Sequence, residues 1–196
     1  MLPLAEPNIG RPLPPAPRSH ESNPTDDRRG DMTMQLVSRS ADRPTHQLGG
    51  IQARTLIGGS HSGAAFCILE APIGPKTLAG PLHTHHHEDS CWYVIEGEFA
   101  AQIGDDEVHE GPGSLIFAPR GVAHTYWNPG TSPAMYLEMC WPAGLERYLQ
   151  QLGTIVDRGG DDILDEVVRL GAEFGIDMDW GSLDILTQRH SVHIAM

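Results

Sequence analysis

The run GSLIFAPRGVAHTYWN, residues 113–128, decides the fold of this chain. Its apolar stretch suits a short strand, Pro-Arg-Gly at 119–121 suits a turn, and His124 opens a further strand. Earlier in the chain, His83 and His85 stand two positions apart, so both rings point to the same face of an extended backbone. A closed sheet can bring these two imidazoles and that of His124 onto one ion. The spacing therefore predicts the metal pocket of a small β-barrel.

Short apolar or alternating runs surround this segment and indicate further strands. The candidate strands are residues 64–71, 91–96, 98–103, 107–109, 114–118, 124–127 and 134–141. Turn-forming residues separate them, for example Gly-Asp-Asp at 104–106 and Asn-Pro-Gly at 128–130. Many short strands at this spacing indicate an all-β sandwich or barrel, which we place at residues 34–141.

The two ends of the chain have other patterns. Residues 1–33 are rich in proline and poor in aliphatic side chains, so we expect a disordered N-terminal arm. Residues 142–196 form a predicted helical C-terminal extension, because their apolar residues recur at helical spacing. Its candidate helices are residues 143–152, 161–174 and 182–189. We expect these helices to pack on the barrel exterior or at a dimer contact.

The composition argues against several kinds of partner. A formal net charge of −13 disfavours binding to nucleic acid and to anionic membranes. No run of about 18 apolar residues occurs, and no basic segment followed by an apolar stretch suggests a secretory signal. Cys67, Cys91 and Cys140 lie far apart without a CxxC pattern, so we expect buried thiols in a reducing cytoplasm.

The run PLHTHHHEDSCWYVIEG, residues 81–97, together with residues 113–128, resembles the two signature motifs of the cupin superfamily. The resemblance covers roughly residues 50–141. It implies a double-stranded β-helix, or jelly roll, and it implies that the three histidines named above are metal ligands. Imidazole ligands suit iron, nickel, manganese, copper, cobalt or zinc.

One position departs from the family pattern. The family's metal-binding glutamate stands seven residues before the glycine that is Gly97 here, and that position holds Ser90. Asp89 fits a shorter family spacing, but a shift of one residue turns its side chain to the opposite face of a regular strand. Glu88 shares the parity of Ser90, and a β-bulge could redirect either carboxylate. Three alternatives follow: a three-histidine site completed by water, a replacement carboxylate, or a barrel that has lost its metal. We expect the first.

Strand parity predicts the side chains around this site. Counting from Ser90 places Trp92 and Val94 inward, and Phe117 is a further candidate for the pocket wall. An apolar, aromatic-lined cavity beside a metal suits a small organic ligand with one or two chelating oxygens. For each aromatic residue, ordinary packing in the barrel core is the alternative.

Two residues are candidates for catalysis. Parity from His124 places Tyr126 inward, where its hydroxyl can donate to a bound oxygen or to a substrate. Glu88 is the second candidate, because the missing family glutamate often serves as a general base. His86 and His87 are expected to be exposed or to support the ligands.

The resemblance implies a metal-dependent enzyme that acts on a small oxygenated organic compound. Dioxygenation, as in the quercetinase-like cupins, is the most populated option. The alternatives are a non-catalytic ligand-binding or regulatory cupin with little or no metal, and an isomerase or cyclase that uses the metal as a Lewis acid. We expect a homodimer, because the helices and the N-terminal arm offer surfaces for pairing.

Overall fold

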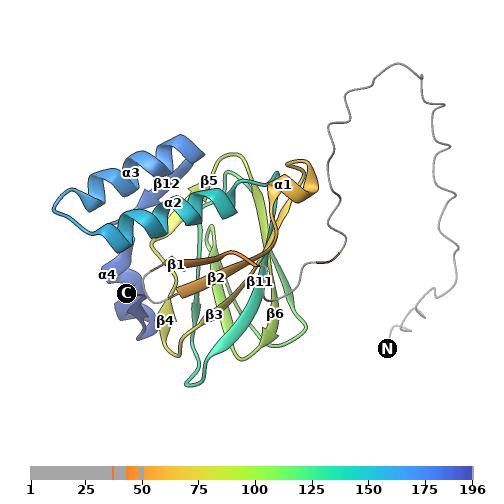
Figure 1. The fold of residues 1–196 in the computed structure, drawn as a ribbon. Coiled ribbons are helices and arrows are strands. Elements are labelled where there is room, and N and C mark those ends of the chain that lie inside the picture. The colour runs from red at the N-terminus through yellow and green to blue at the C-terminus, as the bar shows by residue number, and fades with distance from the viewer. Residues whose placement is uncertain (1–36, 38–42, 49–50, 196) are drawn as a thin grey trace, which may run out of the picture. The chain divides into compact units, whose positions relative to one another are not determined.

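The computed structural model describes residues 37, 43–48 and 51–195, and two β-sheets form its barrel (Figure 1). The predicted N-terminal arm, residues 1–33, lies outside the described residues. The predicted all-β class with helices near the C-terminus is confirmed.

Within the described residues, the first sheet has six strands in the order β1-β2-β3-β11-β6-β9. All of their pairings are antiparallel. The strands are β1 (Thr45–Leu48), β2 (Ile51–Ile57), β3 (Cys67–Ile73), β6 (Asp89–Glu96), β9 (Leu115–Ala118) and β11 (Ala134–Trp141). A short helix, α1 (Gly59–Ser62), connects β2 to β3.

The second sheet is built around β10, which pairs with β7 on one side and with β4 and β5 on the other. Its strands are β4 (Thr77–Leu78), β5 (Leu82–His85), β7 (Phe99–Ile103), β8 (Asp106–Glu110), β10 (His124–Asn128), β12 (Ile176–Asp179) and β13 (His193–Ile194). The strands β12 and β13 come from the predicted helical extension. They join the sheet by pairing with β5 and β4.

Turn residues fix the backbone at the ends of β6 and β10. Gly97 ends β6 with φ +83°, and a Cβ there would lie 2.7 Å from the Cα of Ala134. After β10, the side-chain oxygen of Asn128 accepts from the backbone N–H of Gly130, and its amide donates to the carbonyl of Ile73. Asn128 therefore shapes the turn after His124, as its position in the sequence suggested.

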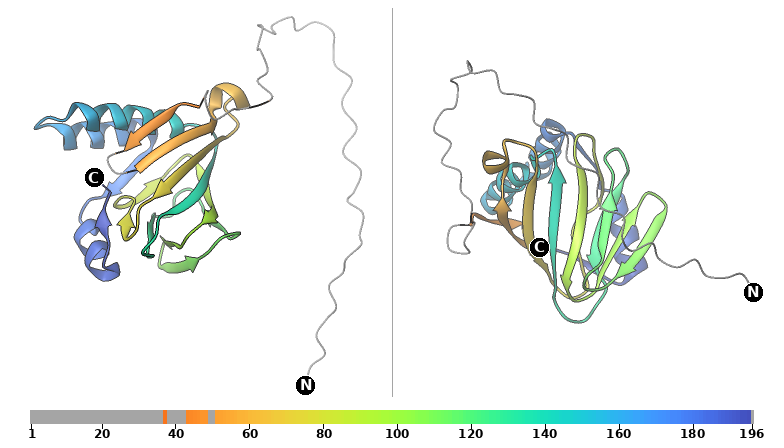
Figure 2. Two further views of the ribbon diagram at one scale, coloured as in Figure 1. Left: turned by 60° about the horizontal axis from the view of Figure 1, so that its bottom comes forward. Right: turned by 90° about the vertical axis from the view of Figure 1, so that its right-hand side faces the viewer.

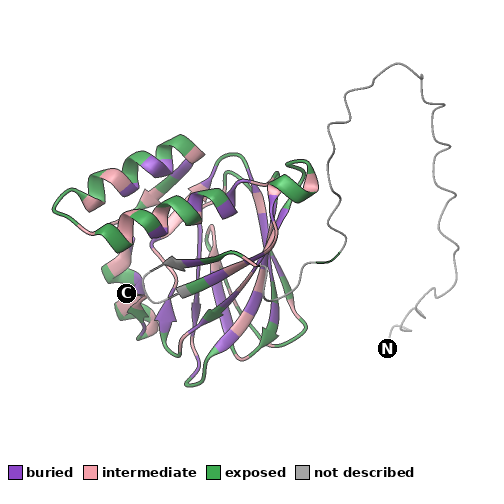
Figure 3. Ribbon diagram, in the orientation of Figure 1, coloured by how far each residue is buried: buried purple, intermediate pink, exposed green. Residues whose placement is uncertain are grey.

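The main core lies between the two sheets, where inward-facing side chains alternate with outward-facing ones (Figure 3). On β11, for example, Tyr136, Glu138 and Cys140 face inward and are buried. Every residue of β10 is buried, because both of its faces are covered. A second cluster, which includes Trp127 and Leu186, covers the outer face of this strand.

Three longer helices follow the barrel strands: α2 (Leu145–Arg158), α3 (Ile163–Phe174) and α4 (Ser182–His190). Figures 1 and 2 show α2 and α3 lying together, with α4 at a separate place. α4 packs on the outer face of the second sheet, as expected for a helix on the barrel exterior. The apolar side chains of α2 also line a cavity that His83 and His85 line, a role that the sequence did not predict.

The sequence located most of the barrel strands within a few residues. All seven predicted ranges overlap strands, namely β3, β6, β7, β8, β9, β10 and β11, while β1, β2, β4, β5, β12 and β13 were not predicted. The three cysteines are free and buried, as expected. Among the described residues, no helix has the length and apolar character needed to cross a membrane.

Candidate metal centre

Three histidine side chains converge at one end of the barrel. His83 and His85 lie two residues apart on β5, and the antiparallel register places His124 of β10 directly opposite His83. The ring centroids of His83 and His124 are 4.6 Å apart, and His85 lies 5.2 Å from each. One nitrogen from each ring lies within 4.8 Å of the others. The predicted convergence of the three imidazoles is confirmed, and they could hold a metal ion.

Backbone contacts determine which nitrogen of two rings is free. Nδ1 of His83 lies 2.9 Å from the carbonyl oxygen of Pro81, and Nδ1 of His124 lies 2.9 Å from that of Val122. A carbonyl oxygen only accepts hydrogen bonds, so Nδ1 carries the proton in both neutral rings. The lone pair is then on Nε2, which is the arrangement of a metal-binding histidine.

The environment favours neutral rings. Burial lowers the pKa of His83, and burial lowers the pKa of His124 to about 3, with the neighbouring His83 adding to the effect. The pKa of His85 is lowered well below its ordinary value, first by burial and then by the two other histidines. Neutral imidazoles offer their lone pairs, so the site is prepared to bind a cation at neutral pH.

Glu88 lies behind His85. Its Oε2 is 3.7 Å from Nδ1 of His85, and both atoms are buried without a hydrogen-bond partner. This separation exceeds that of a hydrogen bond. Burial raises the pKa of Glu88. Glu88 is not among the residues that line the cavity beside the histidines, so it lies behind His85 and away from the space that a substrate would occupy.

Neither candidate carboxylate joins the histidines. Asp89 is held by Arg120, whose backbone N–H and guanidinium donate to it at 2.7–3.1 Å. These bonds lower the pKa of Asp89 to about 2. Ser90 is fully buried, and its Oγ lies 3.2 Å from Sγ of Cys140. In the described part of the chain, the group of side chains able to hold a metal consists of the three histidines alone.

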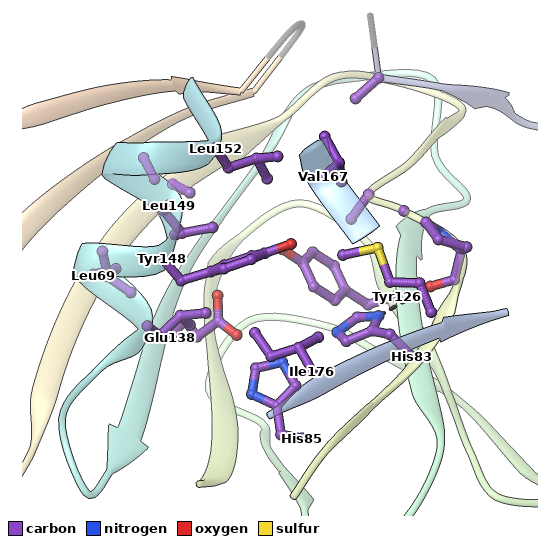
Figure 4. A pocket seen from close by; sticks show the side chains of 18 of the residues that line it. Leu69, His83, His85, Tyr126, Glu138, Tyr148, Leu149, Leu152, Val167 and Ile176 are labelled. Carbon is purple, nitrogen blue, oxygen red and sulfur yellow. Dashed lines mark hydrogen bonds between the residues drawn. The ribbon is translucent and has the colours of Figure 1, made fainter. Parts of the chain in front are cut away.

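A cavity of about 500 Å³ adjoins His83 and His85 (Figure 4). Tyr126 lines it, as predicted, and its hydroxyl lies 2.6 Å from that of Tyr136. Burial raises the pKa of both phenols, so both stay protonated and one donates to the other. The lining is otherwise mostly aliphatic, so a ligand here would leave water and meet few polar groups.

The other predicted pocket residues lie elsewhere. Phe117 is 51% exposed on β9 and stacks on Trp141, so the prediction that it lines the pocket is wrong. The side chains of β9 alternate, and the phase of Phe117 points it to the outer face. Ser90, Trp92 and Val94 face inward as predicted, but they are packed into the core and are not among the residues that line the cavity. Trp92 still contacts the histidine site, because the centroid of its ring lies 5.6 Å from that of His124.

His86 and His87 are exposed, as expected. His86 Nε2 lies 2.7 Å from a carboxylate oxygen of Asp177, the second residue of β12.

Sequence reasoning missed Glu138. This residue lies on β11, lines the cavity, and accepts a hydrogen bond of 3.1 Å from Nε1 of Trp92. Burial raises its pKa to about 7, although the Trp92 bond acts in the other direction. No sequence signal could have found it, because residues 134–141 are apolar on both strand faces apart from Glu138, and only their burial in the structure shows which face is inward.

It also missed the cavity wall that the C-terminal segment provides. β12 pairs with β5 so that Ile176 lies opposite His85 and Met178 opposite His83, and both residues line the cavity. α2 adds Tyr148, among others. A helical pattern gives no hint of which strand the following segment pairs with, so no sequence signal placed these residues at the site.

Comparison with known proteins finds a family match within the barrel. Residues 71–140 match the family model described as "Cupin domain". The uncharacterized protein MJ1618 of Methanocaldococcus jannaschii is 25% identical over 116 residues, which cover 57% of this chain and 90% of that protein. Residues 71–140 are therefore similar to a cupin domain, and the mostly β structure around them has a double-stranded β-helix fold.

The solved structures that resemble this chain are distant in sequence. KdgF from Halomonas sp. is 15% identical with a TM-score of 0.50, over 57% of this chain and 96% of that one. A predicted oxalate decarboxylase from Thermotoga maritima is 19% identical with a TM-score of 0.48, over 55% and 99% of the two chains. The matched domain contains the three histidines and Glu138, whereas the wall supplied by α2 and β12 follows it in the chain.

Proposed function

We propose that this protein is a metal-dependent enzyme that acts on a small oxygenated organic compound, with dioxygenation as its reaction. The observation that carries the proposal is the convergence of three neutral imidazoles beside a largely apolar cavity of about 500 Å³. Small-molecule sites combine such a cavity with a few directed polar groups.

The donor set fits a divalent transition metal. His83, His85 and His124 offer three nitrogens and no carboxylate, which suits iron, nickel, manganese, copper, cobalt or zinc and leaves coordination positions open. When bound, such an ion supplies a Lewis acid that holds a substrate oxygen, and iron, copper or manganese also supplies redox chemistry.

The chain's own residues would orient the substrate and keep water out. The apolar side chains of α2 and β12 enclose its carbon skeleton. The paired hydroxyls of Tyr126 and Tyr136 contain one hydrogen that their mutual bond does not use, and it can donate to a substrate oxygen. Glu88 orients His85 from behind.

A second candidate function is an isomerase or cyclase that uses the metal as a Lewis acid. Glu138 favours it, because a carboxyl group with a pKa of about 7 can accept and return a proton at neutral pH. Oxygen consumption during turnover separates the two reactions: dioxygenation requires it, and isomerisation proceeds without it.

The metal content of untagged protein tests the proposal. We expect near-stoichiometric metal in the wild type, measured by mass spectrometry of the purified protein, and its loss in a His83→Ala/His124→Ala double variant. His109→Ala is the matched control, because this histidine is exposed on β8 and far from the three ligands in the sheet register. A wild type that takes up no added metal would contradict the enzyme and favour a non-catalytic binding protein.

Two further expectations belong to this proposal. A homodimer is supported by apolar side chains exposed on the outer face of the first sheet, including Leu115, Phe117 and Trp141. Light scattering would reveal a monomer if this expectation is wrong. A reducing cytoplasm is supported by the three free, buried cysteines.

A further inference from the structure

Glu138 is a buried carboxyl group that the three-histidine site does not explain. It lies on β11 at 9% exposure, and within the described residues Trp92 is its only hydrogen-bond donor. A carboxylate has room for about four hydrogen bonds, so most of its capacity is unused. Burying such a group costs free energy unless a partner compensates for the lost water.

Tyr148 presents a second unsatisfied polar group to the same cavity. Its hydroxyl is buried and has no hydrogen-bond partner, and burial raises its pKa. The residue comes from α2, outside the matched cupin domain. Figure 4 shows the side chains of Tyr148 and Glu138 pointing into the cavity that His83 and His85 also line.

A ligand can satisfy both groups together. The Tyr148 hydroxyl donates or accepts, and the Glu138 carboxylate accepts, so a hydroxyl or carbonyl oxygen suits the pair. The walls beside them are aliphatic, with Leu149, Leu152 and Val167 among the lining residues. These walls suit a hydrocarbon body in the same molecule.

We propose that Glu138 and Tyr148 form a second polar subsite of the cavity, which binds one oxygen group of the organic molecule whose other oxygen faces the three histidines. The proposal rests on the proposed function and names its substrate class. The substrate carries two oxygen functions, such as a diol, a hydroxy ketone or a hydroxy acid, on an apolar body.

Burial raises the pKa of Glu138 to about 7, so the charge of this subsite changes near neutral pH. The titratable groups whose pKa responds to Glu138 are Tyr126, Tyr136, Cys91 and Cys140, and the pKa of each is raised. All four are therefore neutral at neutral pH, and Glu138 is the group among them that changes charge there.

Calorimetric titration with 4-tert-butylcatechol tests the subsite. This probe has two adjacent hydroxyls on an apolar body, and phenolic hydroxyls stay protonated near neutral pH. Zinc is the metal of choice for the loaded protein because it is redox-inert. We expect Glu138→Gln to weaken binding about tenfold, since a hydrogen bond to a charged acceptor becomes one to a neutral acceptor. Tyr148→Phe removes one neutral hydrogen bond and should weaken binding about threefold to tenfold.

The pH dependence gives a second readout. In metal-free protein, where no metal-bound hydroxyl loses its proton, wild-type affinity should rise as the pH increases through about 7, because the ionised carboxylate is the better acceptor. The affinity of metal-free Glu138→Gln should stay flat, and Glu138→Asp, which keeps the charge, should restore part of the slope. Glu96→Gln is the matched control, because it makes the same change at an exposed position of the neighbouring strand β6. The zinc content of all variants should equal that of the wild type.

The outcomes separate this proposal from the proposed function. Unchanged probe affinity in both Glu138→Gln and Tyr148→Phe overturns the subsite, even if zinc binds normally. A zinc-loaded wild type that does not bind the probe overturns the two-oxygen substrate class. If the wild type takes up no zinc, the proposed function fails. A tenfold loss of probe affinity in metal-free Glu138→Gln would then still support the subsite.

Discussion

The two sides of the cavity are built in different ways. The histidine side consists of β5 and β10, whose backbone carbonyls fix the protons of two ligands. Another part of the wall consists of side chains from α2, α3 and β12, which are mostly apolar and follow the matched cupin domain in the chain. Metal binding thus depends on two short segments of the barrel, and the shape of the cavity depends on the C-terminal segment. We therefore expect mutations to change metal affinity and cavity shape separately.

The largest effect on stability should come from a substitution in the core of α3. Leu170 of α3 is buried in the main core, so Leu170→Ala should lower the free energy of unfolding by about 2–5 kcal/mol. Val168→Ala on the same helix is the control, because Val168 is 51% exposed and should change stability by less than about 0.5 kcal/mol. Denaturant unfolding measures both variants. The metal content should stay unchanged, and loss of metal in folded Leu170→Ala would show that the two sides are not separable.

Glu138 should give the unfolding free energy a slope with pH. Its folded pKa of about 7 lies above its ordinary value of 4.5, so the folded state binds more protons between these values. Stability is therefore highest below about pH 4.5 for this group, falls as the pH rises to about 7, and is flat above that. The total is on the order of 3 kcal/mol. Glu138→Gln should remove this fall in metal-free protein and Glu96→Gln should keep it; equal slopes in all three would refute the assignment.

Glu88 should influence metal affinity without contacting the metal. Glu88→Gln removes the charge that faces Nδ1 of His85 and should weaken metal binding about 10-fold to 100-fold. Chelator competition measures the affinity. Glu110→Gln, on the exposed strand β8, should leave it unchanged. Equal affinities of Glu88→Gln and the wild type would restrict Glu88 to a packing role.

The smallest expected effect on metal affinity is that of a substitution at Ser90. Ser90→Glu should strengthen metal binding by roughly tenfold, about 1.4 kcal/mol, if its carboxylate reaches the site that the sequence pattern assigns to it. The metal-free variant should be less stable than the wild type, because Ser90 is fully buried and an unpaired charge there is costly. Ser90→Gln controls for size. Equal metal affinities of the Glu and Gln variants would place the new side chain away from the histidines.

The histidine site could be predicted because it lies in two short motifs with fixed spacing. The parity of His83 and His85 places two rings on one face, and the family resemblance supplies the strand pairing that brings His124 to them. The same parity argument disfavoured Asp89 as a ligand, and the structure pairs this residue with Arg120. It failed at Phe117, because the start of β9 fixes its phase and a single apolar run does not reveal it.

The part of the cavity wall that α2 and β12 supply could not be predicted, because its position depends on contacts between segments far apart in the chain. The spacing of apolar residues correctly indicated α2, α3 and α4. However, nothing in that spacing shows that β12 pairs with β5 or that Tyr148 faces the barrel interior. Glu138 was missed for a different reason: a lone charged residue within an alternating strand suggests an outward position, and only the burial of its neighbours reveals the contrary.

Trp92 links the two chemical parts of the cavity, and this gives the protein a built-in optical reporter. Its indole packs against the ring of His124 and donates its N–H to Glu138. Paramagnetic ions quench nearby indole emission, and a change of charge on the hydrogen-bonded carboxylate alters the emission wavelength. A variant that keeps Trp92 while its other tryptophans are replaced by phenylalanine would therefore signal ion uptake and carboxyl ionisation in one spectrum, before any substrate is known.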